Sequence, residues 1–218
     1  MITAIIPFYN QILYTKSLLD QIFKMKTKPD KIILIDDCSE ELFDIKKYSS
    51  KLNIQYIKHK TNRGLNYSWN EGLNLSNTPL ISVLNNDIIL NEFFFDKIIE
   101  VQKENWGIVC PNKAKTIEMV NNENLPPKII HLKKRQGWCW TIKKEVYNLI
   151  GKIPSFLRIY CGDDYIFLKS KNLGFENVMI SNNYVYHYGG ATVNSPVYAG
   201  LREQEKKLFL EHLKGKQW

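Results

Sequence analysis

Side chains that could act on a bound ligand occur at two places in this sequence. Residues 81–87 form an apolar run that ends in two asparagines and Asp87, and a second acidic pair follows at Asp163 and Asp164. Carboxylate oxygens bind hard divalent cations, and a carboxylate can also take a proton from a reacting group. The same residue types are ordinary in turns and helix caps, so either segment alone also fits a structural role.

The elements that must position these side chains alternate between short apolar runs and helical stretches. The apolar runs predict strands at residues 3–7, 31–35, 54–58, 80–84 and 107–110. Nearly continuous Ile, Leu and Val suits strands that are buried on both faces, and the alternation with helices is typical of a parallel sheet. We therefore predict an α/β fold, Rossmann-like, with a mostly parallel central sheet flanked by helices.

The pattern is less regular after residue 111. It predicts a polar loop, two strands and three helices, in the order 112–128, 129–132, 138–142, 143–150, 164–172 and 198–213. We expect the strands of this half to form a small second sheet. No internal repeat or low-complexity linker divides the chain, which predicts a single domain over residues 1–218.

Composition excludes several classes of protein. Of the 218 residues, 44% are hydrophobic, yet no run approaches the roughly 18 to 20 apolar residues of a membrane-spanning helix. The N-terminus lacks the pattern of a signal peptide, and the four scattered cysteines fit neither a zinc site nor a disulfide framework. We expect a soluble cytoplasmic protein. Its net charge of +8 attracts anions, among them nucleotide diphosphates, nucleic acids and an anionic membrane surface.

Polar side chains follow four successive predicted strands. Because ligands of open parallel sheets bind beyond the carboxyl ends of the strands, these groups predict a nucleotide site along one rim. They are Tyr9 and Asn10 after the first strand, Asp36 and Asp37 after the second, Asn62, Arg63 and Gly64 after the third, and Asn85, Asn86 and Asp87 after the fourth.

Sugar transfer from a nucleotide diphosphate would use such a rim. The departing diphosphate needs a cation or positive dipoles, and the attacking hydroxyl needs a base. Asp87 is the only carboxylate of its turn, so it would hold Mn2+ or Mg2+ only together with diphosphate oxygens and water.

The chain resembles the family 2 inverting glycosyltransferases with the GT-A fold over nearly its whole length. Its Asn-Asn-Asp turn is similar to that of rhamnosyltransferase-like members, and it lacks the Gln-x-x-Arg-Trp signature of processive synthases. The motifs that carry the resemblance follow the family order: Pro7-Phe8-Tyr9-Asn10, Asp36-Asp37-Cys38-Ser39, Asn62-x-Gly64, Asn70-x-Gly72, Asn85-Asn86-Asp87, a glycine-led segment from Gly137, Asp163-Asp164 and a C-terminal His187.

The resemblance implies transfer of one sugar, with inversion, from a UDP- or dTDP-sugar to a hydroxyl of a glycan, glycolipid or protein. Residues 1–111 would bind the nucleotide, and residues 112–218, with the C-terminal helix, the acceptor. Asp164 would be the general base with Asp163 beside it, and Asp87 and His187 would bind Mn2+ or Mg2+. The implied donor-binding residues are Pro7, Tyr9, Asn10, Asp36, Asp37, Asn62, Arg63, Gly64, Asn70, Asn85, Asn86 and Asp87.

The sequence departs from the family pattern at two of these sites. Asn85 stands where an aspartate is common, which weakens the expected metal site, and Trp69 stands where an arginine often precedes Asn70. A contact to the diphosphate would then be either missing or replaced by Arg63.

Other classes of function stay open on the sequence. A non-catalytic module that binds a nucleotide sugar or a glycan would tolerate the Asn-Asn-Asp turn. A nucleic-acid-binding protein would fit the positive charge and aromatics such as Trp138, Trp140 and Tyr160. A transferase acting on a modified DNA base would combine the two activities. Association with an anionic membrane surface would also suit the charge.

Overall fold

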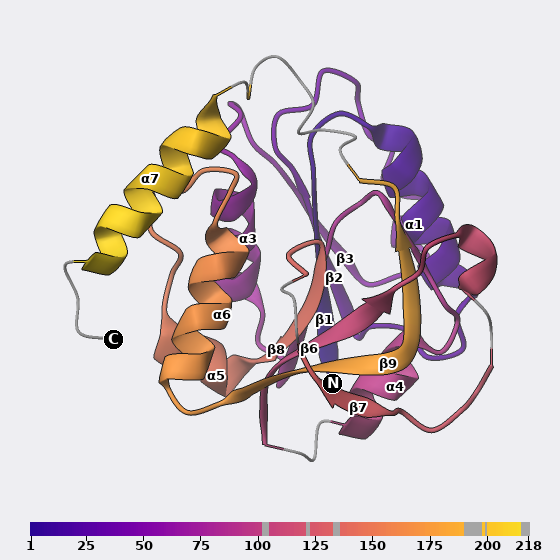
Figure 1. The fold of residues 1–218 in the computed structure, drawn as a ribbon. Coiled ribbons are helices and arrows are strands. Elements are labelled where there is room, and N and C mark those ends of the chain that lie inside the picture. The colour runs from indigo at the N-terminus through magenta and orange to yellow at the C-terminus, as the bar shows by residue number, and fades with distance from the viewer. Residues whose placement is uncertain (102–104, 121–122, 133–135, 190–197, 199, 215–218) are drawn as a thin grey trace.

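A computed structural model describes residues 1–101, 105–120, 123–132, 136–189, 198 and 200–214 of the chain (Figure 1). Within these residues, nine strands form one sheet, with β3-β2-β1-β4-β8-β6-β9-β5 as its main order and β7 paired to β9. The strands are β1 (Ile2–Phe8), β2 (Lys31–Asp36), β3 (Ile54–Lys58), β4 (Leu80–Leu84), β5 (Ile88–Leu90), β6 (Trp106–Lys113), β7 (Ile129–His131), β8 (Cys139–Lys143) and β9 (Glu176–His187).

The first four strands of the sheet order, β3, β2, β1 and β4, run parallel to one another. Beyond β4 the sheet is mixed, because β8 is antiparallel to both β4 and β6 whereas β6 and β9 are parallel. The carboxyl ends of β1, β2, β3 and β4 therefore meet at one rim, which is the upper edge in Figure 1, opposite the N-terminus.

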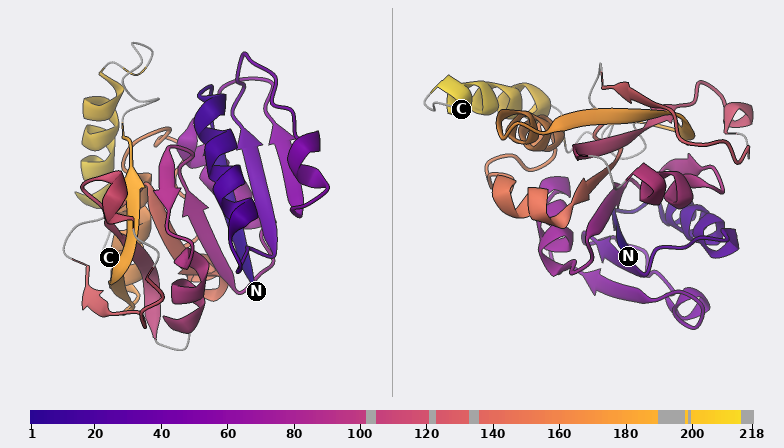
Figure 2. Two further views of the ribbon diagram at one scale, coloured as in Figure 1. Left: turned by 90° about the vertical axis from the view of Figure 1, so that its right-hand side faces the viewer. Right: turned by 90° about the horizontal axis from the view of Figure 1, so that it is seen from below.

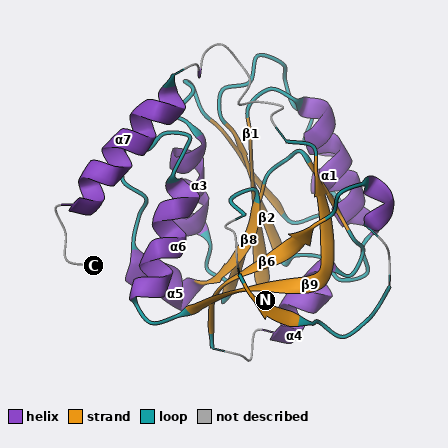
Figure 3. Cartoon of the chain, viewed as in Figure 1, coloured by secondary structure: helices purple, strands orange, loops and turns teal. Residues whose placement is uncertain are grey.

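Helices cover both faces of the sheet (Figures 2 and 3). They are α1 (Ile12–Lys24), α2 (Lys46–Ser49), α3 (Leu65–Leu75), α4 (Phe94–Val101), α5 (Lys144–Ile150), α6 (Gly162–Asn172) and α7 (Leu201–Lys214), with a short 3-10 turn at Ile117–Met119. Alternate strand residues enter two separate cores. Ile32 and Leu34 of β2 join the core beneath α1 and α4, whereas Ile33 and Ile35 join the core beneath α3, α5 and α6. The continuous apolar strands of the sequence follow from burial on both faces.

The C-terminal half differs from the sequence prediction in one respect. The expected small second sheet is not separate among the described residues, because β5 and β7 both pair with β9, and β9 continues into the main sheet through β6. With 12 residues, β9 is long enough to have partners at both ends, and its register against β6 shifts after Pro111. A bulge of this kind bends a strand and lets one sheet turn a corner.

Across the described part of the chain, the helices are too short or too polar for any of them to span a lipid bilayer.

Candidate active site

The loops that follow β1 and β2 are joined to each other at the rim. Asn10, in the left-handed conformation at φ 54°, donates its N–H to Ser39 Oγ at 2.8 Å, and its side-chain oxygen accepts the Glu40 N–H at 3.0 Å. Pro7 is buried in β1, and Tyr9 beside Asn10 is half-buried. Asn10 thus fixes the shape of the rim through its own hydrogen bonds.

Asp36 is a buried carboxylate at the end of β2. It accepts the Ser39 N–H at 2.6 Å and the Tyr56 hydroxyl at 2.9 Å, and it lies 3.1 Å from Lys58 Nζ. Burial and the bond to Asp36 raise the pKa of Tyr56 well above its ordinary value, so the phenol stays a neutral donor. The carboxylate of Asp36 therefore builds the turn.

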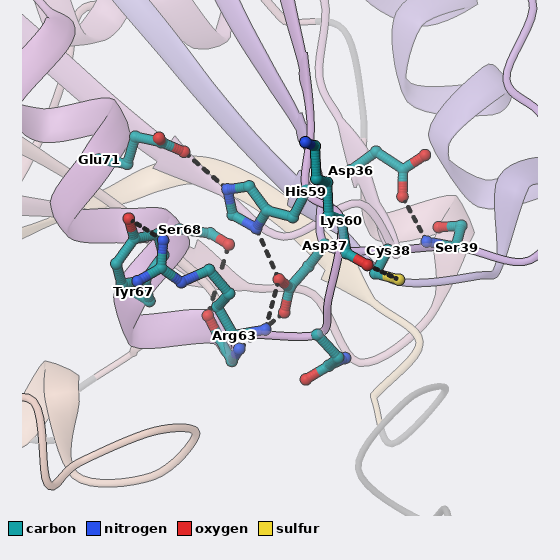
Figure 4. A network of polar contacts seen from close by, with 12 residues as sticks. Asp36, Asp37, Cys38, Ser39, His59, Lys60, Arg63, Tyr67, Ser68 and Glu71 are labelled. Carbon is teal, nitrogen blue, oxygen red and sulfur yellow. Dashed lines mark hydrogen bonds and ion pairs between the residues drawn. The ribbon is translucent and has the colours of Figure 1, made fainter.

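Asp37 ties the next loop to the rim (Figure 4). Its carboxylate accepts the backbone N–H groups of Arg63 and Gly64, each at 2.8 Å, and contacts His59 Nδ1 at 2.7 Å. Gly64 has φ 95°, and a Cβ atom there would lie 2.6 Å from the carbonyl oxygen of Arg158. Only glycine meets both conditions, which explains the Asn-x-Gly motif in physical terms.

His59 is held between two carboxylates. Its second ring nitrogen, Nε2, lies 2.8 Å from Glu71 Oε2 on α3, opposite the contact with Asp37 (Figure 4). Burial alone lowers the pKa of His59, but the bonds and charges of Asp37 and Glu71 outweigh it and raise the pKa above its ordinary value. Both ring nitrogens can donate only in the imidazolium form, so the arrangement fits a protonated His59.

A pH-dependent stability follows from His59. Because its pKa is raised on folding, its contribution is complete below the ordinary value of about 6.5 and is lost as pH rises through the higher folded value. We expect the melting temperature of wild type to exceed that of His59→Gln most at acidic pH, with the difference shrinking toward pH 9. Thermal denaturation across pH 5.5 to 9 measures this. His131→Gln, at an exposed histidine on β7, is the matched control. A difference that stays constant or grows with pH contradicts the assignment.

Asp87 and His187 meet where β4 ends and β9 ends. Asp87 Oδ1 lies 3.2 Å from His187 Nε2, and both side chains are largely buried. The imidazole stacks on the Trp138 ring with a centroid separation of 5.1 Å. The backbone oxygen of Asp87 also accepts the Tyr188 N–H at 3.1 Å, so main-chain pairing sets the position of both residues.

The two asparagines before Asp87 differ in their surroundings. The Asn86 amide donates to Thr15 Oγ1 at 3.1 Å on α1 and makes a longer contact with the Gln11 carbonyl at 3.4 Å, so it secures the helix to the turn. Asn85 Oδ1 is buried and has no hydrogen-bond partner among the described residues. A buried acceptor without a donor is destabilising, so Asn85 Oδ1 is available to accept a hydrogen bond from a hydroxyl or N–H group.

Two further sequence-predicted residues have partners within the protein. Asn70 exchanges two hydrogen bonds with the backbone of Ile153, each at 2.9 Å, and the Asn62 amide donates to the Tyr198 hydroxyl at 3.3 Å. Asn70 therefore fixes the segment before α6 to α3.

Asp163 and Asp164 lie in the first turn of α6, where the helix dipole interacts favourably with carboxylates. A Cβ atom added at Gly137 would come within 2.4 Å of Asp163 Oδ2, so Asp163 packs tightly against that glycine. Burial, followed by the charges of Asp164 and Asp163, raises the pKa of the Cys161 thiol to about 11. The thiol form therefore predominates near pH 7, which disfavours Cys161 as a nucleophile there.

A carboxylate of α7 holds the segment that leads into α6. Glu205 is only 1% exposed, and it accepts the backbone N–H groups of Arg158, Ile159 and Tyr160, the shortest bond being 2.7 Å from Tyr160. From the other side, the Asn66 amide of α3 donates to the Tyr160 carbonyl at 3.1 Å. The approach to Asp163 and Asp164 is therefore fixed by two helices far apart in sequence.

Glu205→Gln tests this clamp. The amide presents an N–H group toward backbone donors, and leaving one of them buried without an acceptor destabilises by about 1–3 kcal/mol. We expect a melting temperature lower by roughly 2–12 °C, with slower turnover because the start of α6 loses its support. The exposed Glu203→Gln on the same helix is the control. Equal melting temperatures in the two variants would show that the hydrogen bonds of Glu205 do not stabilise this segment.

The structure thus brings the predicted rim residues together in two groups. The loops around Asp36, Asp37 and Gly64 form one group, and Asp87 with His187 forms the other. Sequence reasoning missed His59, Glu71 and Glu205, whose partners come from other elements.

Comparisons with known proteins agree with this architecture. The sequence profile described as Glycosyl transferase family 2 matches residues 3–162, which is more than half of the chain. An uncharacterized glycosyltransferase of Haemophilus influenzae is 26% identical over 181 residues, covering 77% of this chain and 60% of that protein. The chain therefore spans less than two thirds of the length of this curated relative.

Solved structures share the fold at low sequence identity. S. aureus TarS 1-349 has a TM-score of 0.66 at 16% identity, over 85% of this chain and 60% of TarS 1-349. GalNAc-T7 with UDP, GalNAc and Mn2+ has a TM-score of 0.70 at 13% identity, over 92% of this chain and 46% of its own. The mannosyltransferase PcManGT of Pyrobaculum calidifontis, in complex with GDP-Man and Mn2+, has a TM-score of 0.68 at 14% identity, over 88% and 57%. At these identities the likeness shows the fold alone.

Proposed function

The chain belongs to glycosyl transferase family 2, and on this premise we propose that it transfers one sugar from a nucleotide-diphosphate sugar to an acceptor hydroxyl, with inversion. The observation that carries the proposal is the pairing of Asp87 with His187 on a rim that also holds the Asp36-Asp37 turn. A diphosphate bound at Asp87 and His187 would leave its nucleoside to the loops around Asp36, Asp37 and Gly64. Residues 1–111 would bind this donor, and residues 112–218 the acceptor.

The residues at the end of β4 fit a divalent cation. Asp87 offers a carboxylate oxygen and His187 an imidazole nitrogen, 3.2 Å apart, a donor set that suits Mn2+ better than Mg2+. Among the described residues no group of three or more potential ligands gathers, so donor oxygens and water would complete the coordination. When bound, the cation would neutralise charge on the departing diphosphate. The ring of His187 is kept in place for this by its stacking on Trp138.

Asn85 and the joined loops supply the nucleoside contacts in this proposal. The free Asn85 Oδ1 would accept a ribose hydroxyl, which takes the place of the contact made by the more common aspartate. Backbone groups of the Asp36 turn would read the base, since the Asp36 carboxylate is already satisfied within the protein. UDP- and dTDP-sugars both fit this scheme, and rhamnosyl transfer is one case of it.

Asp164 is the proposed general base. It would take the proton of the acceptor hydroxyl as that oxygen attacks the anomeric carbon, on the face opposite the departing diphosphate. The tight packing of Asp163 against Gly137 supports assigning the base to Asp164 rather than to its neighbour. The acceptor would be a glycan, a glycolipid or a protein.

A panel of nucleotides tests the donor site. UDP, dTDP, GDP and their sugars, each with and without Mn2+, are added to the purified protein, and the melting temperature is measured. Ligand at about 100 times its Kd stabilises by roughly 2.7 kcal/mol, a shift of about 5 °C or more for a chain of this size. A shift selective for one base and strengthened by Mn2+ supports the proposal. An unchanged melting temperature with every nucleotide contradicts the proposal. The glycan-binding and nucleic-acid-binding functions would then be the ones to test.

A further inference from the structure

A pocket of about 410 Å3 lies between the start of α3 and the segment that precedes α6. Its lining includes Arg63 and Tyr67 from one side, and Ser155 and Arg158 from the other, and contains no carboxylate. Asp87 and His187 are not part of the lining either, so the pocket is separate from the proposed cation site.

The guanidinium of Arg63 is held in place within this pocket. It lies 3.5 Å above the centre of the Tyr67 ring and donates to the Tyr67 hydroxyl. The same ring meets His59 edge-on, at 5.5 Å between centroids. Stacking of this kind orients an arginine and leaves its other N–H groups free to bind an anion.

Arg158 supplies the second guanidinium. Its side chain is exposed, whereas its backbone is fixed by Glu205, which accepts its N–H at 2.9 Å, and by Asn66, whose N–H it accepts at 2.9 Å. Among the described residues, neither Arg63 nor Arg158 forms an ion pair. Two arginines without ion pairs, the Arg63 guanidinium held by stacking and Arg158 placed by its fixed backbone, therefore make a candidate anion site.

We propose that this pocket binds an anionic group, phosphate or carboxylate, carried by the saccharide acceptor; the inference rests on the proposed function. The donor diphosphate is assigned to the rim of Asp87, which the pocket does not include. In this inference Arg63, although part of the proposed donor-binding half and expected from the sequence to contact the donor, contacts the acceptor instead. The segment bearing Arg158, by contrast, leads within six residues to Asp164, so it spans at most about 20 Å. The acceptor is the molecule whose hydroxyl approaches Asp164. A sugar unit bound at the nearby Arg158 would therefore belong to the acceptor.

Arginine side-chain N–H resonances provide a direct test. They are recorded while glucose 6-phosphate, glucuronate, glucose, inorganic phosphate or UDP with Mn2+ is added. We expect the first two ligands to shift the Arg63 and Arg158 signals, and glucose to leave them unmoved. In Arg158→Gln the two anionic sugars should bind roughly 10- to 100-fold more weakly, the effect of losing hydrogen bonds to a charged group. Lys152→Gln, an exposed charge of the same segment outside the lining, should bind them as wild type does.

Other outcomes overturn the inference. Equal binding of glucose, or of free inorganic phosphate, would remove the anionic saccharide from the pocket. If UDP with Mn2+ is the only ligand that shifts the Arg63 signals, Arg63 contacts the donor and not the acceptor. Failure of the donor site would give a different result. Nucleotides would then not raise the melting temperature of wild type, while the anionic sugars would still shift the N–H signals of both arginines. Retained donor stabilisation in Arg158→Gln, with lost binding of anionic sugars, is the expected pattern.

Discussion

Asp164→Asn should nearly abolish transfer while leaving nucleotide binding intact. The amide keeps the size of the side chain at the start of α6 but cannot take a proton from the acceptor hydroxyl. A positioned general base contributes about 10²- to 10⁴-fold, so we expect a rate loss of that order. The measurement is the rate of nucleoside diphosphate release in the presence of acceptor, together with the thermal shift caused by the nucleotide alone.

Asp163→Asn is the matched variant for this experiment. It makes the same chemical change one residue earlier, in a side chain that packs on Gly137. We expect a smaller loss of rate than in Asp164→Asn. A larger loss would place the base at Asp163, and unchanged rates in both variants would remove this acidic pair from the chemistry.

Asp87→Asn should weaken donor binding and abolish the response to Mn2+ together. The affinity of oxygen-ligand cation sites varies over orders of magnitude with the number of charged ligands, and Asp87 is the only carboxylate of its turn. We therefore expect the Kd of the donor to rise about tenfold or more in the presence of Mn2+. The affinity of the free nucleoside should not change, because it has no phosphate to share the cation. Calorimetric titration of nucleoside and nucleotide sugar, with and without Mn2+, separates the two effects.

Asn85→Asp is the complementary change. It places a second carboxylate beside Asp87, at the position whose side-chain oxygen lacks a partner among the described residues. We expect stronger Mn2+ binding in this variant and a steeper dependence of donor affinity on the cation. A metal-dependent site would be excluded if Mn2+ does not change donor affinity in wild type, in Asp87→Asn or in Asn85→Asp.

Much of the fold could be predicted from the sequence because its central strands are buried on both faces. The predicted strands 54–58 and 80–84 match β3 and β4 to the residue. The pattern fails at β9, where polar and apolar residues mix because most of the strand is only partly buried. At three residues, β5 is too short to produce a periodic signal.

The site was less accessible to sequence reasoning than the fold. Asp36 and Asp37 directly follow the predicted strand 31–35, so their place on the rim could be predicted. The partners of His59 and Glu205 lie 12 to 47 residues away, and only folding brings them together. One signal was available at Glu205, which shares helical spacing with the buried Phe209 and is therefore a charge on an apolar face. Such a charge requires a buried partner, but the sequence does not identify which groups provide it.

The stereochemistry of turnover tests the central claim most directly. A donor identified by thermal stabilisation is incubated with the protein and Mn2+, and NMR follows the first anomer of the sugar that forms, on an acceptor or on water. We expect release of the nucleoside diphosphate and a first-formed product of opposite anomeric configuration to the donor. A first product that retains the donor configuration, or a donor that binds and never turns over, would contradict inverting transfer at this rim.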